Sequence, residues 1–187
     1  SIVLACTHMS AFKTGALIVI TNQQELKEYV DTGEIVDAVI SVQMIENIFF
    51  KNTPLHDGAM IIASGRIHAA ACILPVSKRQ DLPKSYGLRH RAALGITEKT
   101  DAIAIVVSEE TGKISVAQGN SIKSVTSNEL EHKYLAPIFG VEYKKNNNKL
   151  MPETVPLKAL VTRSSGVNSS TAFSSTFLKM QYFCFAS

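Results

Sequence analysis

Two runs of apolar, largely β-branched residues place the strongest limit on how this chain folds. Residues 15–20 (GALIVI) and 102–107 (AIAIVV) carry no polar side chain, so neither shows the alternation of a strand with one solvated face. Continuous runs of this kind are typical of strands buried on both faces of a sheet. The chain has 187 residues, about the length of one domain, and 45% of them are hydrophobic. We therefore predict an α/β fold, a single mixed-sheet domain with flanking helices.

Helical and strand periodicities surround these two runs. The predicted helices lie at 1–12, 23–30, 41–50, 89–97 and from 126 to about 140. The predicted strands lie at 15–20, 58–63, 66–74, 102–108 and 113–118, with tight turns at Ser64-Gly65 and Gly119-Asn120. Along 66–74 we expect successive side chains to point to opposite faces of the sheet without interruption, so that Ile67 and Ala69 lie on the same face. Ser41 is the expected N-cap of its helix, and Thr126 and Glu129 have the spacing of a capping box.

The composition changes after Gly140, and we place a domain boundary there. Residues 1–140 are expected to form the folded domain, and residues 141–187 a polar, Ser- and Thr-rich, poorly ordered tail. The first part carries thirteen Lys and Arg against fourteen Asp and Glu, whereas the tail carries six against two. The net charge of +3 therefore comes from the tail, and no nucleic-acid partner is expected for the folded part. No run of 18 apolar residues occurs, so no segment is expected to span a membrane.

Several common signatures of nucleotide and hydrolase chemistry are missing from the sequence. It contains no Gly-x-x-x-x-Gly-Lys-Ser/Thr loop, no Gly-x-Gly-x-x-Gly and no Gly-x-Ser-x-Gly elbow. Its three cysteines, Cys6, Cys72 and Cys184, are far apart and odd in number, which favours reduced thiols over a disulfide framework. The candidate chemistry lies instead in three polar clusters that interrupt the apolar pattern.

The first cluster is Asn52–Ala59 (NTPLHDGA), between a predicted helix and a predicted strand. Pro54 cannot continue the helix, so His56 and Asp57 are expected on a loop at the start of a buried strand. Gly58 leaves room for a ligand to approach the backbone there. The alternative is an Asp and His turn that satisfies its own amides.

The second cluster is Gly87–Gly95 (GLRHRAALG), in which Arg89, His90 and Arg91 open a short helix. The helix dipole makes cations unfavourable in the first turn of a helix. Their presence here is explained if an anion binds against them. Backbone N–H groups at a helix start, together with Arg, form a phosphate site. The alternative is a solvated basic turn.

The third cluster is Ser108–Gly112 (SEETG), which ends the run AIAIVV. The paired carboxylates of Glu109 and Glu110, beside a hydroxyl, can hold a divalent cation through oxygen ligands. A polar hairpin turn is the ordinary alternative. Together the three clusters supply an acid or base, a phosphate cradle and a metal site, which are the components of phosphoryl transfer.

The same residues carry a resemblance to a known family. The segments NTPLHDGAMII, GLRHRAALGITEKTDA and VVSEETGKIS are similar to the motifs of the bacterial diadenylate cyclase (DAC) domain, which condenses two ATP into cyclic di-AMP with release of pyrophosphate. Asp-Gly-Ala and Arg-His-Arg are the hallmarks of that family, and their order and spacing match. The resemblance covers residues 1–140, includes GALIVI, and points to the membrane-tethered branch with a single catalytic domain.

The resemblance implies a role for each matching residue. Asp57 would assist attack of the ribose 3′-OH on the α-phosphate, with Gly58 and Ala59 shaping the close approach. The residues implied to bind ATP are Leu74 in the adenine pocket and Gly87, Arg89, His90, Arg91, Ser108 and Glu109. The residues implied to bind Mn²⁺ or Mg²⁺ are His56, Glu109 and Glu110. The family usually has Thr or Ser where this chain has Leu88, so one hydroxyl contact to phosphate is expected to be lost.

The implied reaction also predicts how the protein assembles and where it acts. Joining two identical nucleotides by two equivalent bonds suits a two-fold pair of subunits, so we expect a homodimer with ATP as substrate. The catalytic domain is expected in the cytoplasm, tethered to the cell membrane by N-terminal helices absent from this sequence. Two other functions stay open: an adenylyltransferase acting on another hydroxyl, and a catalytically silent nucleotide-binding sensor. A DNA-scanning relative is disfavoured because residues 1–140 are net acidic.

Overall fold

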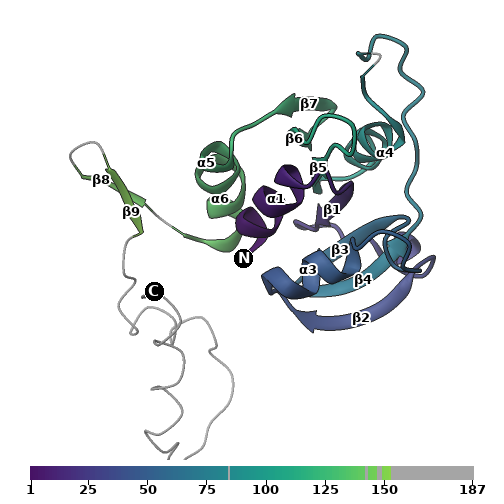
Figure 1. The fold of residues 1–187 in the computed structure, drawn as a ribbon, viewed down its shortest axis with the longest axis horizontal. Helices are drawn as coiled ribbons and strands as arrows, with labels where there is room; N and C mark the ends of the chain where they lie inside the picture. Colours follow the sequence, from purple (N-terminus) through teal and green to yellow (C-terminus); the bar gives the residue numbers. More distant parts are fainter. Residues whose placement is uncertain (84, 142, 147–148, 153–187) are drawn as a thin grey trace, which may run out of the picture. The chain divides into compact units, whose positions relative to one another are not determined.

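The computed structural model describes residues 1–83, 85–141, 143–146 and 149–152. Its centre is a seven-stranded sheet with strand order β2-β4-β3-β1-β5-β6-β7 (Figure 1). The strands are β1 (Ala16–Ile20), β2 (Glu34–Val39), β3 (Ala59–Ala63), β4 (Arg66–Cys72), β5 (Ile103–Val107), β6 (Ile114–Gln118) and β7 (Ser121–Ser124). β1 and β3 are parallel, and the other neighbours in this sheet are antiparallel. The predicted mixed sheet with flanking helices is confirmed.

Different helices cover the two faces of the sheet, so the fold has three layers (Figure 1). One face carries α1 (Ile2–Ala11), α3 (Val42–Ile48) and a helical succession of α5 (Ser127–Glu129), the π-helical η1 (Leu130–Leu135) and α6 (Ala136–Phe139). The other face carries α2 (Lys27–Val30) and α4 (Leu88–Thr97). Every residue of β1 and β5 is buried, and alternate residues enter opposite cores. Their apolar runs predicted this burial on both faces.

The predicted helix caps are present. The Oγ of Ser41 accepts a hydrogen bond from the backbone N–H of Met44 at 3.1 Å and so caps α3. The capping box of Thr126 and Glu129 is formed, and the helical succession that it opens ends at Gly140 in the left-handed conformation, with φ 64°. The sequence did not predict the π-helical part of that succession.

The predicted alternation along β4 is wrong. The pairing of β4 with β3 shifts between Ile61–Ala69 and Ile62–Ile67, so His68 is an extra residue in a β-bulge. Ile67 consequently packs in the core on the side of α1 and α3, whereas Ala69 packs in the opposite core. A bulge changes which face the following residues point to, and the hydrophobic pattern does not show where it lies.

The sequence predicts none of the strands β2, β7, β8 and β9. β2 is an edge strand with no buried residue, so no apolar run marks it, and its pairing with β4 is interrupted where Asp37 adopts a φ of 44°. β8 (Tyr143–Asn146) pairs with β9 (Lys149–Pro152) inside the segment predicted as a tail. The rest of that segment, residues 153–187, lies outside the described residues.

Two cysteine side chains contribute to the two cores. Cys6 lies on the side of α1 and Cys72 on the side of α4, and both are buried and free. Burial raises the pKa of the Cys6 thiol to about 12 and that of the Cys72 thiol to about 11. Both thiols are therefore protonated at neutral pH and act as small core residues. Cys184 lies outside the described residues.

Removing the N-cap of α3 tests how much this contact contributes. Ser41→Ala deletes the acceptor of the Met44 N–H, and we expect the free energy of unfolding to fall by about 1 kcal/mol. Ser41→Gly should cost only roughly 0.3 kcal/mol, because glycine is tolerated at an N-cap. Urea denaturation of the three proteins measures both changes. An unchanged free energy of unfolding in Ser41→Ala would show that the hydroxyl contributes nothing.

Candidate active site

The three predicted clusters lie at the same end of the central sheet. β1 and β3 begin at this end, and β4 and β5, antiparallel to them, finish there. The first cluster therefore precedes β3, the third follows β5, and β1 begins between them. The second cluster opens α4, which packs on the face of these strands. We call this end of the sheet the site end.

The second and third clusters meet at the start of β1. Nη1 of Arg89 donates a hydrogen bond to Oε2 of Glu109 at 2.9 Å. A Cβ atom on Gly15 would stand 2.8 Å from that Nη1 and 3.0 Å from that Oε2, so the pair lies where a side chain would be. Sequence reasoning missed Gly15 as a site residue. Its signal is a glycine placed directly before a strand that is buried on both faces.

A small cavity of about 60 Å³ opens beside this ion pair. The second and third clusters and the end of β5 provide most of its walls, which consist of Ser85, Gly87, Leu88, Arg89, His90 and residues 106–110. Ligand pockets usually enclose roughly 300–1,000 Å³, so this cavity can hold one polar group but not a whole nucleotide. The rest of a nucleotide would lie outside it, over the site end.

The first cluster forms a turn that is fixed by its own hydrogen bonds and by glycine. Nδ1 of His56 lies 2.5 Å from the carbonyl oxygen of Thr53, so the predicted self-satisfied turn is present at this histidine. Gly58 has a φ of 136°, and a Cβ there would stand 2.6 Å from the carbonyl carbon of Ala71. The Asp57 carboxylate is exposed and makes no hydrogen bond within the part of the chain that the structure describes. Asp57 therefore offers an unengaged carboxylate at the site end.

His90 is buried beneath the segment that precedes α4. Its ring stacks on that of Tyr86, with centroids 4.5 Å apart and planes 9° apart. Burial lowers the pKa of His90, and the opposing effect of the Glu110 charge is smaller. The imidazole is therefore neutral at pH 7 and adds no positive charge to the site.

Three further residues that the resemblance assigns to ATP have contacts within the protein. Nη1 of Arg91 donates to the carbonyl oxygen of Arg79 at 2.9 Å. The Oγ of buried Ser108 accepts from the backbone N–H of Thr111 at 3.2 Å and stabilises the turn that carries the two glutamates. Leu74 is buried in the core between the sheet and α4. Their contacts with ATP stay predictions.

A divalent ion is the cofactor predicted for His56, Glu109 and Glu110. Among the residues that the structure describes, no three His, Cys, Asp or Glu side chains are gathered to hold a metal ion. Nδ1 of His56 is engaged with Thr53, and one oxygen of Glu109 with Arg89. The two carboxylates still provide hard oxygen donors, and Mg²⁺ is usually held by one or two carboxylates together with substrate phosphates. The donor set thus fits an ion whose coordination a phosphate completes.

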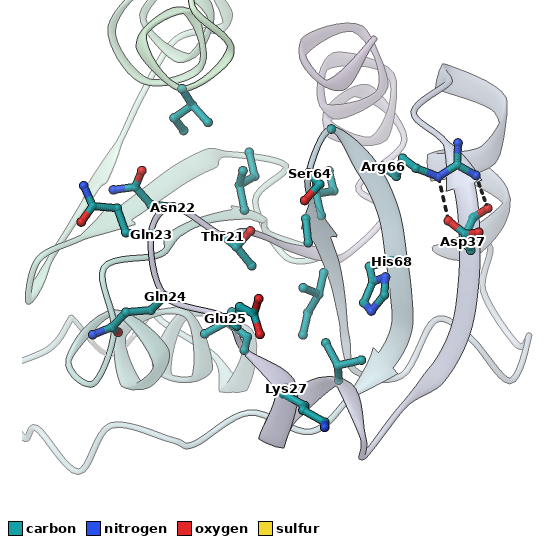
Figure 2. A pocket seen from close by; sticks show the side chains of 18 of the residues that line it. Thr21, Asn22, Gln23, Gln24, Glu25, Lys27, Asp37, Ser64, Arg66 and His68 are labelled. Atoms are coloured by element: carbon teal, nitrogen blue, oxygen red, sulfur yellow. Dashed lines mark hydrogen bonds and ion pairs between the residues drawn. The ribbon is translucent and has the colours of Figure 1, made fainter. Parts of the chain in front are cut away.

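A much larger cavity, about 740 Å³, lies at the opposite end of the sheet (Figure 2). It is lined by the end of β1, the turn between β3 and β4, and residues of α2, β2 and α6. Arg66, on its wall, is already paired with Asp37 at 2.7 Å. None of the residues predicted for the site lines this cavity. By volume alone this cavity would be the better candidate for a ligand site. The three sequence motifs, however, lie around the small cavity at the site end.

Comparison with known proteins accounts for this convergence. Residues 3–122 match the family model described as the DisA bacterial checkpoint controller nucleotide-binding (DAC) domain. The chain belongs to the DAC family. It is 42% identical over 146 residues to the cyclic di-AMP synthase CdaA of Bacillus subtilis, which covers 78% of this chain and 52% of that protein. It is 47% identical over 135 residues to a diadenylate cyclase of Listeria monocytogenes, and this match covers 72% of this chain and 50% of that protein.

The DAC fold is also shared with a solved structure. DacA from Staphylococcus aureus, crystallised as a double mutant, is 43% identical and matches 74% of this chain and 92% of that chain with a TM-score of 0.71. All three clusters lie within the residues that match the DAC family model. The chain spans about half the length of the curated relatives it matches. No helix among the described residues is long and apolar enough to cross a membrane.

The low pKa of His90 predicts a pH dependence. In an NMR titration the midpoint of its Cε1–H resonance should fall below about 6.5, because burial disfavours the charged form. A histidine with a depressed pKa in the folded state loses its stabilising contribution as the pH falls, so the free energy of unfolding should decrease below about pH 6.5. His90→Gln assigns the resonance and should flatten that part of the profile. A midpoint at or above the ordinary value would contradict the prediction.

Proposed function

We propose that this chain is the catalytic domain of a diadenylate cyclase, which condenses two ATP into cyclic di-AMP and releases two pyrophosphates. The observation that carries the proposal is the convergence at the site end of the unengaged Asp57 carboxylate, the Arg89 guanidinium and the two glutamates of the SEETG turn. Membership of the DAC family supports it. The names of the relatives, cyclic di-AMP synthase and diadenylate cyclase, support the choice of substrate and product.

Asp57 is the group that we assign to the proton of the attacking hydroxyl. The ribose 3′-oxygen of one ATP forms a bond to the α-phosphorus of the other, the bond to pyrophosphate breaks, and the hydroxyl proton must be accepted. A positioned carboxylate can take that proton as a general base. Asp57 is exposed and free of other hydrogen bonds within the described residues. Gly58 packs directly against the backbone of Ala71, and Ala59 is buried at the start of β3, so we assign both to fixing the turn that presents Asp57 to the ribose.

Arg89 is the group that we assign to the phosphates. Its guanidinium is held by Glu109 at the start of β1, and a triphosphate, with more charge than one carboxylate, can take the place of that partner. Gly87, His90 and Ser108 line the small cavity with Arg89 and are the next proposed ATP contacts. Arg91 and Leu74, which do not line it, complete the proposed set, with Leu74 assigned to the adenine. Released Glu109, with Glu110 and His56, would hold Mn²⁺ or Mg²⁺, which neutralises phosphate charge when bound.

A second copy of the chain is the partner that we propose completes the site. The small cavity holds only part of a nucleotide, and two equivalent bonds require two nucleotides related by a two-fold axis. The surroundings of the site end are apolar and exposed: Phe12 is 82%, Phe50 66%, Ile73 70% and Leu88 71% accessible. Each of these residues lies close to the terminus of a helix or strand at the site end. Contact between two copies would bury them.

The cell membrane is the place where we propose that this domain acts. Its motifs resemble those of the membrane-tethered branch of the family, in which additional helices attach a cytoplasmic catalytic domain to the membrane. This proposal concerns the full-length protein and does not change the chemistry of the site.

The experiment that tests the function is a product analysis. The protein is incubated with ATP and Mn²⁺, and the products are identified by mass spectrometry. Cyclic di-AMP confirms the proposal. A different adenylylated product would instead identify an adenylyltransferase for another hydroxyl. Bound ATP without turnover would identify a nucleotide-binding sensor.

Asp57→Asn separates proton transfer from binding. Asparagine keeps the shape of the side chain but cannot accept the proton, so turnover should fall by roughly 10²–10⁴. ATP affinity, measured by calorimetry, should change only a few-fold, because the phosphates rest on Arg89. Asp31→Asn removes an exposed carboxylate beside the cavity at the opposite end and should leave turnover unchanged. Near wild-type turnover in Asp57→Asn would mean that Asp57 only shapes its turn.

Replacing both glutamates of the third cluster tests the metal assignment. Glu109→Gln combined with Glu110→Gln removes two anionic oxygen donors, so cyclic di-AMP formation should be abolished at every Mn²⁺ concentration. Glu25→Gln combined with Glu28→Gln makes the same change of charge near α2 and serves as the matched control. Unchanged turnover in the first double variant would overturn the assignment.

A further inference from the structure

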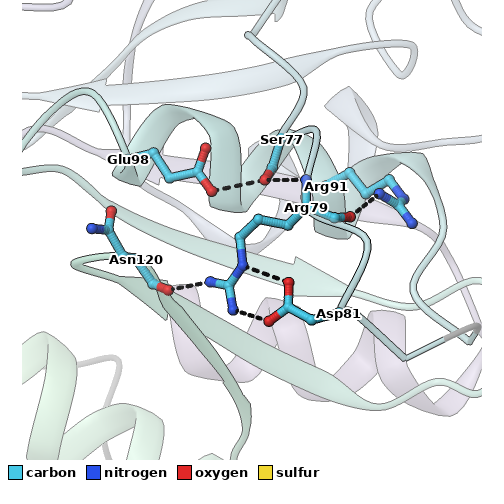
Figure 3. Close-up of polar contacts among 6 residues, drawn as sticks. All are labelled: Ser77, Arg79, Asp81, Arg91, Glu98 and Asn120. Atoms are coloured by element: carbon cyan, nitrogen blue, oxygen red, sulfur yellow. Dashed lines mark hydrogen bonds and ion pairs between the residues drawn. The ribbon is translucent and has the colours of Figure 1, made fainter.

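The segment between β4 and α4 is tied to the rest of the domain by Ser77 and Arg79, two side chains to which the proposed reaction gives no role (Figure 3). We call its residues 75–83 and 85–87 the strap. The strap leaves the site end after β4 and returns to it at the N-cap of α4. Ser85 and Gly87 of the returning part line the small cavity, and Tyr86 stacks on His90. The position of the strap therefore sets one wall of the site.

The outgoing part of the strap lies directly on α4. A Cβ on Gly95 would stand 2.1 Å from the carbonyl oxygen of Pro75, so the strap backbone occupies the space of a helix side chain. The N–H of buried Ser77 donates to the carbonyl oxygen of Arg91 at 3.0 Å, and its hydroxyl donates to Glu98 at 2.7 Å. These contacts fix the strap as far as Ser77.

Arg79 makes the next contacts and joins three parts of the chain (Figure 3). Its guanidinium binds both carboxylate oxygens of Asp81, with Nε to Oδ1 at 3.0 Å and Nη2 to Oδ2 at 2.5 Å. Nη1 donates to the carbonyl oxygen of Asn120, in the turn between β6 and β7, at 2.7 Å. The carbonyl oxygen of Arg79 itself accepts from Arg91 of α4. A planar guanidinium satisfies such a set of acceptors in one fixed geometry, which an ammonium cannot do.

We propose that Arg79 is a positioning residue, which clasps the middle of the strap to the turn between β6 and β7 and thereby holds Tyr86 against His90 in the wall of the nucleotide site. This inference rests on the proposed function, which supplies the nucleotide. Without the contacts of Arg79, residues 78–83 and 85–86 of the strap must become ordered when the substrate binds, and the conformational entropy lost in that step weakens binding. The reacting groups are untouched, so the effect should fall on affinity rather than on turnover.

Arg79→Ala in the full chain tests this role. We call the bonds from the Arg79 guanidinium to Asp81 and to the Asn120 carbonyl oxygen the clasp. We expect the Kd for ATP, measured by calorimetry, and the KM to rise about five- to tenfold, the range for losing one or two net hydrogen bonds. The kcat should stay within about twofold, because Asp57 and Arg89 keep their places. The nuclear Overhauser contact between the rings of Tyr86 and His90 should disappear.

Arg66→Ala is the matched control. Arg66 makes a comparable set of bonds, from Nε to the Asp37 carboxylate at 2.7 Å and from Nη2 to the Asp37 carbonyl oxygen at 2.6 Å, beside the cavity at the opposite end of the sheet. The Arg66→Ala substitution removes the same kind of side chain and the same charge as Arg79→Ala. It should leave the contact between the Tyr86 and His90 rings, the Kd for ATP and the kcat unchanged. An equal effect in both variants would overturn the proposal.

The proposal is also overturned if Arg79→Ala keeps the ring contact, or if the contact is lost while the Kd for ATP stays the same. Should Arg79→Ala fail to fold, Arg79→Lys and Asp81→Asn carry the same test, because each breaks the bidentate pair with a small change of shape. If wild-type protein binds ATP but forms no cyclic di-AMP, the proposed function fails. The ring contact and the Kd still decide the clasp in that case.

Discussion

The parallel pairing of β1 with β3 is the constraint on which the rest of the structure depends. The two strands run side by side from Ile18–Met60 to Ile20–Ile62, in the middle of a sheet buried on both faces. Parallel neighbours need a crossover, which here contains α2, β2 and α3 and brings the chain back to the end where β1 began. The start of β1 and the turn before β3 are adjacent for this reason. Antiparallel β5 then delivers the SEETG turn to the other side of β1.

The positive charge of Arg89 is already compensated in the site that results. The Arg89 guanidinium lies against Glu109, and His90 is neutral because it is buried. Under the proposed function, a bound polyphosphate would replace Glu109 as the anionic partner of Arg89 and would free that carboxylate. The same short motif would then serve both the phosphates and a cation that accompanies them. Among the described residues, the side chains alone gather no set of three metal ligands.

The parts of this fold that could be predicted from the sequence are those with a local signal. The buried runs of β1 and β5, the Ser41 cap and the capping box at Thr126 each follow from a few neighbouring residues, and each is present. β2 could not be predicted because an exposed edge strand has no apolar face to reveal it. The bulge at His68 could not be predicted because one extra residue leaves the composition of the strand unchanged.

The site shows the same division between local and distant causes. Its motifs were visible, but their contacts depend on strand order, since Arg89 and Glu109 are twenty residues apart and meet only because α4 and β5 flank β1. The importance of Gly15 appears only once that pair is seen in the space where its side chain would be. The hydrogen bond from Arg91 to the strap was likewise invisible, because nothing in the motif distinguishes its two arginines.

The burial of Cys6 and Cys72 has a consequence for how the domain responds to its surroundings. Oxidants attack the thiolate, and a thiol with a pKa of about 12 or about 11 forms almost none at the pH of a cell. Both sulfur atoms are also out of reach of peroxide and of disulfide partners, within the two cores. Within the described residues, therefore, neither cysteine is a ready target for oxidation at neutral pH.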